Sequence, residues 1–377
     1  MKIAIFHNAL DNIGGAELVD LILAKELNAD IFTTNIDKEK IEKMGFSTKN
    51  IYSIGRVPIN APFRQEAIYW KFKFLNIEKS FKKYDFYIIA GDWAMSAAKN
   101  NKPNFWYVYS PTREIWDLYE YTREKILPHP ILGTLNKYIF DLWVFLRRKI
   151  NYHNAQKINH FIAISKNVQK RIKKYLKKDS TIIYPPTEIK KYKFKKHEDY
   201  WLSVNRLINH KRVELQLKAF SKMPNEKLII VGSYEKSHHF KKYTNYIQKI
   251  KPKNVEIKSW ISDKELTELY SKCKGFITTS KDEDYGLTVI EAMASGKPVI
   301  APNEGGYKET ITKKTGILIN NINEDKIINS INKINKELKE NTLKYKFFCQ
   351  NQARKFDTKI FIKNIKTEIK NIMRIEQ

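Results

Sequence analysis

The chain has 377 residues, of which 42% are hydrophobic and 13% aromatic, and its 69 basic side chains outnumber 41 acidic ones to give a formal net charge of +28. This hydrophobic content excludes a disordered basic tail, and the length is enough for about two or three domains. The two cysteines, Cys273 and Cys349, lie far apart without CxxC spacing, which excludes a disulfide scaffold and a zinc ribbon.

The chain begins with a short apolar run, too brief for the about 7–15 residues of a signal-peptide core. We interpret residues 3–6 as a first buried strand. No segment approaches the about 18 apolar residues of a membrane span, and the longest candidate, residues 138–146, contains Asp141. We therefore expect a cytosolic protein that at most rests on a membrane.

Short apolar runs alternate with amphipathic stretches, which indicates βα units around parallel sheets. A helix is expected over residues 16–27, after the Gly14-Gly15 turn. Ser165 can cap a second helix, in which Val168 and Ile172 recur at a four-residue step. Strands of the first sheet are expected at residues 3–6, 86–90, 106–109 and 161–164.

Two consecutive prolines, Pro185 and Pro186, neither continue a helix nor fit a central strand. We place a linker at residues 184–196, between a first domain of residues 1–183 and a second of residues 197–355. The second domain is expected to contain a helix at 213–220 and strands at 200–204, 227–231, 255–257, 275–279 and 299–301. The fold class predicted is α/β, with two Rossmann-like doubly wound domains that face each other across a cleft, where the strands' carboxyl ends bind ligands.

The most informative segment runs from Glu283 to Ile300. It turns at Gly286 and opens a helix, so the free amide groups near Gly286, Leu287 and Thr288 form an anion site. Glu283 lies in the loop and Glu291 about one turn inside the helix. Each carboxylate can accept two hydrogen bonds from a vicinal diol, which suits ribose or a sugar. A loop acid beside a surface-helix acid remains the alternative.

Two cations follow the first strand of the second domain. Arg206 can bind a phosphate with two parallel N–H bonds, and Lys211 as a point charge. A solvated surface pair is the alternative in so basic a chain. The Gly14-Gly15 turn lets a ligand phosphate approach the backbone, although a plain tight turn explains it as well. It matches neither G-x-G-x-x-G nor the Walker phosphate loop, which weakens hydride-transfer and NTPase interpretations.

Together these residues resemble glycosyltransferase family 4 of the GT-B fold. The resemblance spans nearly the whole chain, and parts of it are most similar to the O-antigen mannosyltransferase branch. The matching segments are Gly14 to Glu17, Ser110 to Arg113, Trp116 to Tyr119, Tyr184 to Pro186, His210 to Val213, Trp260 to Tyr270, Glu283 to Glu291, Gly305 to Glu309 and Thr315-Gly316.

The resemblance implies a retaining transfer of a hexose from a nucleotide sugar to an acceptor hydroxyl. The branch suggests mannose from GDP-mannose. By matching, Arg206, Lys211 and Gly15 would hold the diphosphate and Glu283 the donor sugar. Glu291 would bind the ribose and Ile261, through its backbone, the base. As in the family, a C-terminal helix within residues 356–377 would return to the first domain.

One position departs from the family pattern. A histidine is common where Val108-Tyr109-Ser110-Pro111 stands here. The Tyr109 hydroxyl can hydrogen-bond a sugar or phosphate oxygen, but it carries no positive charge near neutral pH. Tyr109 and Arg113 are assigned to the acceptor or sugar side.

No metal is expected in the reaction. The charge of the departing nucleoside diphosphate would be stabilised by Arg206, Lys211 and the helix start at Gly286. Asp282-Glu283-Asp284 only mimics a metal-binding D-x-D, and no histidine or cysteine cluster accompanies it. A front-face route, in which a donor phosphate oxygen helps to deprotonate the acceptor, is proposed for the family. No cofactor beyond the nucleotide sugar is expected.

Two rival functions follow from the same features. The charge and the aromatic content could serve nucleic acid, but no helix-turn-helix, RRM or zinc-finger signature is present and the basic residues are spread through both domains. We therefore expect no nucleic acid partner. A UDP-sugar epimerase or hydrolase of the same fold remains an alternative.

Residues 64–83 and 137–157 mix aromatic side chains with lysine and arginine, a composition typical of surfaces that meet anionic lipid. A core helix with a solvated basic face is the alternative. We predict peripheral attachment to the inner face of the cell membrane and a lipid-linked or cell-surface glycan acceptor. The aromatic residues are Trp70, Phe72, Phe74, Tyr138, Phe140, Trp143 and Phe145.

Overall fold

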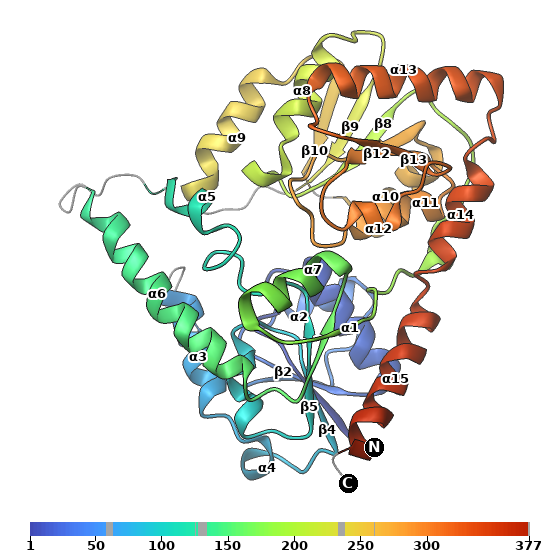
Figure 1. Ribbon diagram of the computed structural model, residues 1–377. Coiled ribbons are helices and arrows are strands. Elements are labelled where there is room, and N and C mark those ends of the chain that lie inside the picture. Colours follow the sequence, from blue (N-terminus) through green and yellow to red (C-terminus); the bar gives the residue numbers. More distant parts are fainter. Residues whose placement is uncertain (58–62, 125, 127–133, 233–237, 260, 376–377) are drawn as a thin grey trace. The chain divides into compact units, whose positions relative to one another are not determined.

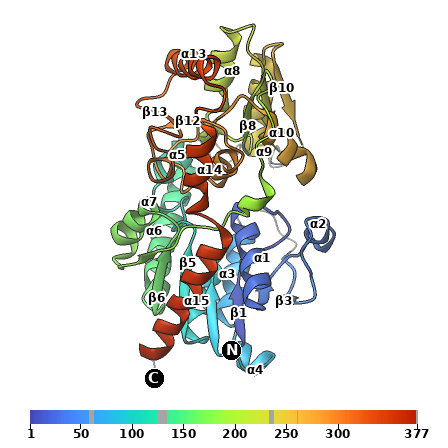
Figure 2. The same cartoon turned by 90° about the vertical axis from the view of Figure 1, so that its right-hand side faces the viewer.

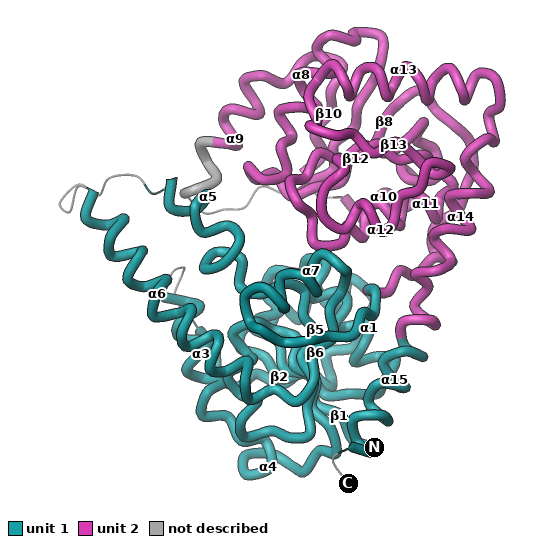
Figure 3. The backbone as a smooth tube through the Cα atoms, in the orientation of Figure 1, with its two compact units in different colours: residues 1–184, 362–377 teal, residues 185–361 magenta. Residues whose placement is uncertain are grey.

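The computed structural model describes residues 1–57, 63–124, 126, 134–232, 238–259 and 261–375. They divide into two compact units (Figure 3). Unit 1 contains residues 1–184 and 362–377, and unit 2 contains residues 185–361. Of the helices in the described ranges, none is long and apolar enough to cross a membrane.

Unit 1 is built on a parallel sheet of seven strands in the order β3-β2-β1-β4-β5-β6-β7. Figure 2 shows β6 and β3 towards opposite sides of this sheet, with β1 and β5 between them. The four expected strands are confirmed, whereas β2, β3 and β7 were not predicted; β3 and β7 have only three and two residues. The strands are β1 (Ile3–Phe6), β2 (Asp30–Thr33), β3 (Ile51–Ser53), β4 (Phe86–Ile89), β5 (Asn104–Val108), β6 (His160–Ala163) and β7 (Thr181–Ile182).

The helices of unit 1 follow the expected βα order. The helix predicted from residue 16 begins at Gly15, and the Ser165 side chain caps α7 by accepting a hydrogen bond of 3.1 Å from the Val168 amide. The helices are α1 (Gly15–Leu27), α2 (Lys38–Lys43), α3 (Phe63–Lys73), α4 (Ile77–Ser80), η1 (Ala94–Lys99), α5 (Tyr119–Glu124), α6 (Leu135–Ala155), α7 (Lys166–Arg171) and η2 (Ile172–Leu176). The chain's last helix, α15 (Thr358–Ile375), belongs to unit 1 from Ile362 on.

Helices cover both faces of this sheet. Figure 1 shows α15 on one side of the unit 1 strands and α3 with α6 on the other. On α15, Ile365, Ile369 and Ile372 recur every three or four residues and are buried, as expected for the core-facing stripe of a helix. The central strands β1 and β4 are buried along their whole length, which is typical of a parallel sheet covered on both faces.

Unit 2 has a six-stranded parallel sheet in the order β10-β9-β8-β11-β12-β13. The five expected strands are confirmed, although β11 ends at Ile277, two residues before the predicted end, and β13 was not predicted. The strands are β8 (Trp201–Val204), β9 (Leu228–Val231), β10 (Val255–Lys258), β11 (Gly275–Ile277), β12 (Val299–Pro302) and β13 (Gly316–Ile319). The helices are η3 (Ile189–Lys191), η4 (Asn209–Lys211), α8 (Val213–Ser221), α9 (His238–Ile250), α10 (Asp263–Lys272), α11 (Leu287–Ala294), α12 (Tyr307–Thr310), α13 (Glu324–Glu340) and α14 (Lys346–Arg354).

Each sheet has one place where the strand order reverses direction. In unit 1 it lies between β1 and β4, and in unit 2 between β8 and β11. In parallel α/β sheets, such a reversal point at the carboxyl edge is the usual place of a ligand site. Most of the candidate site residues follow the strands at these two places, whereas Ile261 follows β10 and Tyr109 and Arg113 follow β5.

Candidate functional site

In unit 2, two loops are tied together at the reversal point. One follows β8 and contains η4, and the other follows β11 and runs to Gly286. The Thr279 hydroxyl donates to the carbonyl of Lys211 at 2.8 Å, and the amide of Lys281 donates to the carbonyl of His210 at 2.7 Å. These contacts hold Lys211 beside the loop that carries Glu283.

Lys211 and Glu283 form an ion pair with 2.6 Å between Nζ and Oε2. The Ser280 hydroxyl donates to the same carboxylate oxygen. Burial would raise the pKa of Glu283, but the charge and hydrogen bond of Lys211, together with the Ser280 hydrogen bond, outweigh it and lower the pKa to about 2. The carboxylate is therefore ionised near neutral pH. The side chains of Lys211 and Glu283 remain 14% and 20% exposed, so a ligand can reach the pair.

The loop that carries Glu283 is fixed by its backbone. The Gly306 amide donates to the Glu283 carbonyl at 2.8 Å, and a Cβ on Gly305 would stand 2.2 Å from that carbonyl oxygen. Only glycine allows so close an approach. Arg212, which sequence reasoning did not single out, forms an ion pair of 3.0 Å with Glu304 and donates to two carbonyls of the loop after β11.

Gly286 ends the same loop and caps α11. Its φ of 92° lies in the left-handed region, and a Cβ there would stand 2.6 Å from the ring of Tyr307. Leu287 and Thr288, the first residues of α11, are half-buried. The first amide groups of a helix have no partner within it, so the helix start offers them to an anion.

Glu291 lies on α11 with its carboxylate towards two tyrosines. The buried Tyr270 donates its hydroxyl hydrogen to Glu291 at 2.8 Å. Burial raises the pKa of the Glu291 carboxyl, and the hydrogen bonds from Tyr270 and Tyr192 oppose that rise. The carboxylate keeps acceptor capacity for a diol in addition to the tyrosine bond.

The remaining predicted residues of unit 2 occupy separate turns. Arg206 is exposed between β8 and η4, and Ile261 is half-buried between β10 and α10. Trp260, which belongs to the same family-like segment as Ile261, lies outside the described residues. Among the described residues, no group of three or more histidine, cysteine, aspartate or glutamate side chains is arranged to hold a metal ion.

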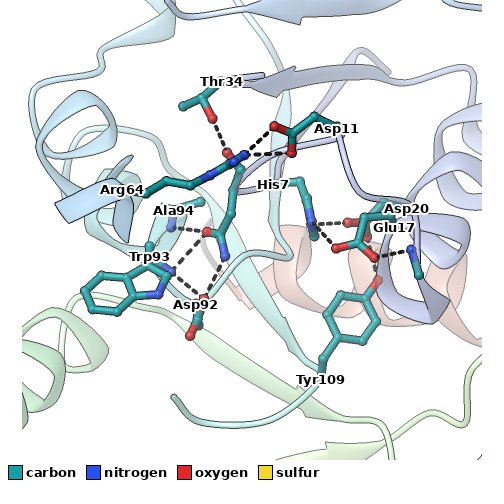
Figure 4. A network of polar contacts seen from close by, with 12 residues as sticks. His7, Asp11, Glu17, Asp20, Thr34, Arg64, Asp92, Trp93, Ala94 and Tyr109 are labelled. Atoms are coloured by element: carbon teal, nitrogen blue, oxygen red, sulfur yellow. Dashed lines mark hydrogen bonds and ion pairs between the residues drawn. The ribbon is translucent and has the colours of Figure 1, made fainter. Parts of the chain in front are cut away.

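In unit 1, a buried charge cluster surrounds His7, directly after β1 (Figure 4). The His7 Nδ1 atom forms an ion pair with Asp20 at 2.5 Å, and Nε2 lies 3.3 Å from Glu17. Burial would lower the pKa of His7, but the Asp20 and Glu17 carboxylates outweigh it and raise the pKa to about 10. His7 is therefore a buried imidazolium near neutral pH.

Tyr109 is part of this cluster. Its hydroxyl donates to Asp20 at 2.6 Å, with Asp20 fully buried (Figure 4). Burial raises the pKa of Tyr109 well above its ordinary value, so the hydroxyl stays protonated. Tyr109 carries no positive charge, whereas His7 does. Both side chains contact the Asp20 carboxylate.

The Gly14-Gly15 turn is connected to His7 through Glu17. The Gly14 amide donates to Glu17 at 2.8 Å, and the other oxygen of that carboxylate is the one that faces His7. Gly15, the first residue of α1, is exposed. In the predicted phosphate-contacting turn, the Gly14 amide is therefore bound to the Glu17 carboxylate. The His7 imidazolium contacts the other oxygen of that carboxylate.

A second polar group lies after β4. Asn8 donates to Asp92 at 2.7 Å and accepts the amide hydrogens of Trp93 and Ala94 at 3.1 and 3.0 Å (Figure 4). A Cβ on Gly91 would stand 2.3 Å from the Asn8 side-chain oxygen, so glycine is required there. Asn8 thus joins the loops after β1 and β4 at the reversal point of the sheet.

Arg113 is held by a neighbour on its own segment. Its Nε and Nη2 atoms donate to one oxygen of Asp117 at 3.0 and 2.8 Å, and Arg171 lies 3.4 Å from the same oxygen. Arg113 is half-buried.

Sequence reasoning missed His7, Asp20 and Asn8, and it gave no role to Arg212 and Tyr270, which it named only within family-like segments. One signal was available for the first two, because an acid at position 20 interrupts the apolar run of α1 and His7 directly follows a strand of four apolar residues. No local pattern indicates that Tyr270 binds Glu291.

Comparison with known proteins adds three findings. Residues 185–346 match the family model described as glycosyl transferases group 1. An uncharacterized glycosyltransferase of Methanocaldococcus jannaschii is 29% identical over 193 residues, covering 50% of this chain and 52% of the relative. An alpha-1,3/1,6-mannosyltransferase of Candida glabrata is 28% identical over 193 residues, covering 39% of this chain and 42% of the relative. The chain thus spans about half the length of these relatives or less.

Solved structures resemble nearly the whole chain. Anabaena HepE in complex with UDP and glucose has a TM-score of 0.72 at 18% identity, with 98% of this chain and 99% of that chain covered. Sucrose-phosphate synthase from Thermosynechococcus elongatus has a TM-score of 0.71 at 14% identity, with 99% of both chains covered. At such identities the likeness concerns the fold, and it confirms the predicted GT-B architecture of two parallel-sheet α/β domains.

Proposed function

We propose that the protein is a glycosyltransferase that moves a hexose from a nucleotide sugar to a hydroxyl of a glycan acceptor. The observation that carries the proposal is the partly exposed Lys211–Glu283 pair beside the Gly286 turn, with Glu291 one turn into α11. A cation, a helix start and two carboxylates at one strand edge suit a phosphorylated sugar better than any other ligand class. The match of residues 185–346 to glycosyl transferases supports the same function.

In this proposal unit 2 binds the donor. Arg206, Lys211 and the amide groups at Gly286 to Thr288 hold the diphosphate, and Glu283 accepts hydrogen bonds from the sugar hydroxyls. The low pKa of Glu283 keeps it ionised for that task. Glu291 binds the ribose and the backbone of Ile261 the base. The domain boundaries near residues 183 and 197 and the acceptor role of the first domain, with Tyr109 and Arg113, are parts of the same proposal.

We infer mannose as the sugar and GDP as its carrier. The relative from Candida glabrata is named as a mannosyltransferase, and so are others of similar identity. HepE was crystallised with UDP, so UDP-sugars are tested beside GDP-mannose. The lipid-linked or cell-surface glycan acceptor is supported by the mouse relative, 29% identical over 151 residues, whose name specifies mannose transfer to a dolichol-linked glycan.

The mechanism that we propose is retaining and independent of metal. When the glycosidic bond to the diphosphate breaks, negative charge develops on the phosphate oxygens, and Lys211, Arg206 and the α11 start stabilise it. The acceptor hydroxyl attacks from the face that the diphosphate leaves, and a phosphate oxygen takes its proton. We place this reaction at the inner face of the cell membrane.

A thermal-shift screen with GDP-mannose, UDP-glucose and UDP-galactose tests the donor assignment. We expect one nucleotide class to stabilise the wild type and to stabilise Glu291→Ala much less. The matched control is Glu309→Ala, an acid of the same domain on the four-residue helix α12. Equal shifts for wild type and Glu291→Ala would contradict the ribose role.

A turnover assay then distinguishes sugar transfer from the epimerase and hydrolase reactions. We expect labelled mannose to appear in a membrane-lipid fraction with its α configuration kept, also in the presence of EDTA. Free hexose or an epimer formed without any lipid fraction would instead support an epimerase or hydrolase.

A further inference from the structure

Helix α6 of unit 1 presents its apolar side chains to solvent. Six of them recur at intervals of one, three or four residues and form one stripe along the helix. The stripe consists of Leu135, Tyr138, Ile139, Leu142, Phe145 and Leu146, with exposed fractions of 52, 62, 51, 60, 53 and 50%. An ordinary surface helix turns such a stripe towards the core.

The buried face of α6 carries Val144 and Ala155 together with polar side chains. Arg147, Asn151 and Asn154 are 9, 8 and 6% exposed. Arg147 forms an ion pair with Glu66 of α3, and Asn151 accepts a hydrogen bond of 3.1 Å from the Trp116 indole. These polar contacts anchor the buried face of α6 to α3 and to the segment at Trp116, and they leave the apolar stripe in solvent. For α6, the exposed stripe therefore differs from the sequence-based alternative of a core helix with a solvated basic face.

Helix α3 lies beside α6 and adds to the same kind of surface. The Trp143 indole of α6 donates to Glu66 of α3 at 2.9 Å, which fixes the two helices together. Phe63, Trp70 and Phe74 along α3 and at its end are 67, 48 and 73% exposed. Phe72, predicted from composition to belong to an interfacial surface, is instead fully buried.

Basic groups accompany the exposed rings. The Lys149 Nζ lies 4.3 Å from the centroid of Phe145, and the Lys73 Nζ lies 4.3 Å from that of Trp70. Helix α6 carries four basic residues and one acid, and α3 three and one. Both acids are already neutralised, Asp141 by Arg123 and Glu66 by Arg147.

We propose that the α6 stripe and the exposed aromatic residues of α3 form a lipid-docking face that inserts into the interface of an anionic membrane. Exposed apolar side chains rimmed by lysine are the chemistry that such an interface recognises. A second copy of the chain fits less well, because each copy would bring an excess of cations, within a net charge of +28, to the same contact. The inference deepens the proposed function, since a lipid-linked acceptor would be reached from this surface.

The test is flotation of the full chain with phosphatidylcholine vesicles, with and without phosphatidylglycerol, and with no donor or acceptor present. We expect flotation with phosphatidylglycerol and little without it. Leu142→Ser with Phe145→Ser should lower the partition coefficient about tenfold or more, because each side chain loses apolar burial in the lipid. The control is Leu343→Ser with Phe347→Ser, the same residue types at 52 and 66% exposure in unit 2.

A second arm isolates the charge. Lys149→Ala should weaken binding to the phosphatidylglycerol vesicles about fivefold, whereas the exposed Lys339 of unit 2, changed in the same way, should have no effect. The emission of Trp70 should also shift to the blue when these vesicles are added, and Trp70→Phe should remove that part of the shift. Lys149→Ala and Trp70→Phe both keep the wild-type stripe. Their measurements therefore test the proposal even where the double variant folds poorly.

Wild-type protein that fails to float with anionic vesicles would overturn the proposal, as would equal flotation of the stripe variant and its control. A dimer in sedimentation velocity that Leu142→Ser with Phe145→Ser dissolves would assign the face to a second copy instead. None of these results depends on glycosyl transfer, so the lipid-docking face and the proposed function can fail separately.

Discussion

Each of the two sheets carries an ion pair at its carboxyl edge. The two pairs differ in their access to solvent. In unit 1, His7 and Asp20 are 5 and 0% exposed, whereas in unit 2, Lys211 and Glu283 are 14 and 20% exposed. The sealed pair is closed to an incoming ligand, and breaking it leaves a buried charge. The partly exposed pair can share its lysine with an incoming phosphate. We infer that the first pair supports the fold and that the second is available for chemistry.

The strongest test of this comparison removes the accessible cation. We expect Lys211→Ala to lower the rate of sugar transfer about a hundredfold or more, because the leaving diphosphate loses a charge partner. Its unfolding free energy should fall by about 2 kcal/mol, less than for the sealed pair, since the Lys211–Glu283 pair keeps some contact with water. Initial rates and urea unfolding measure the two effects.

Lys281→Ala is the matched control, because Lys281 is exposed and lies two residues before Glu283. It should leave both quantities unchanged. A similar loss of rate in both variants would mean that general basicity, and not the Lys211–Glu283 pair, serves the reaction.

The sealed pair should give the larger loss of stability. We expect His7→Gln to cost about 3 kcal/mol of unfolding free energy, because Asp20 is left buried without its partner. The exposed His153, changed to Gln, should cost almost nothing. Urea unfolding of both variants decides the comparison, and equal small losses would contradict the structural role of the pair.

The same pair predicts a pH dependence. The pKa of His7 rises from 6.5 to about 10 on folding, so its stabilising contribution is complete below pH 6.5 and is lost as the pH rises through about 10. The difference in unfolding free energy between wild type and His7→Gln should therefore shrink between these pH values. A difference that stays constant over this range would show that His7 is neutral in the folded protein.

The fold followed from the sequence because apolar runs and glycine or proline turns are local signals. The strands at 3–6, 86–90 and 299–301 and the turn at Gly286 illustrate this. Strands β3 and β7 carry too few residues for a pattern, and β2 has a polar residue at each end, so their neighbours in the sheet define them.

The candidate site was predicted less completely. Gly286, Glu283 and Lys211 follow strand ends, which the pattern of strands locates. The partners that set their charge and position depend on tertiary contacts between distant segments, as with Tyr270 on Glu291 and Arg212 on Glu304. For α6 the sequence left two interpretations open, an interfacial surface and a core helix, because a helical stripe does not say which side faces the core.

A smaller effect sharpens the role of the Gly286 turn. Gly286→Ala should cost about 2 kcal/mol of unfolding free energy, because the residue has a positive φ and its Cβ would meet the ring of Tyr307 at 2.6 Å. Gly45→Ala is the matched control, with a φ of 83° and no atom within 4 Å of the added Cβ. It should cost about 1 kcal/mol. Equal costs would show that the ring moves aside freely.

The smallest expected effect concerns Glu291. Tyr270→Phe removes one hydrogen bond to its carboxylate and should raise the KM for the donor about fivefold, equivalent to about 1 kcal/mol. Tyr200→Phe removes a comparable bond of 2.8 Å to the carbonyl of Leu269 and should leave the KM unchanged. An unchanged KM in both variants would show that Glu291 does not take part in donor binding.

Isothermal titration of GDP-mannose and UDP-glucose into wild type, Lys211→Ala and Lys281→Ala tests the central claim most directly. The account predicts that wild type and Lys281→Ala bind one of these nucleotide sugars with the same affinity and that Lys211→Ala binds it at least about tenfold more weakly. Undiminished binding by Lys211→Ala, or no binding of either nucleotide sugar by the wild type, would contradict it.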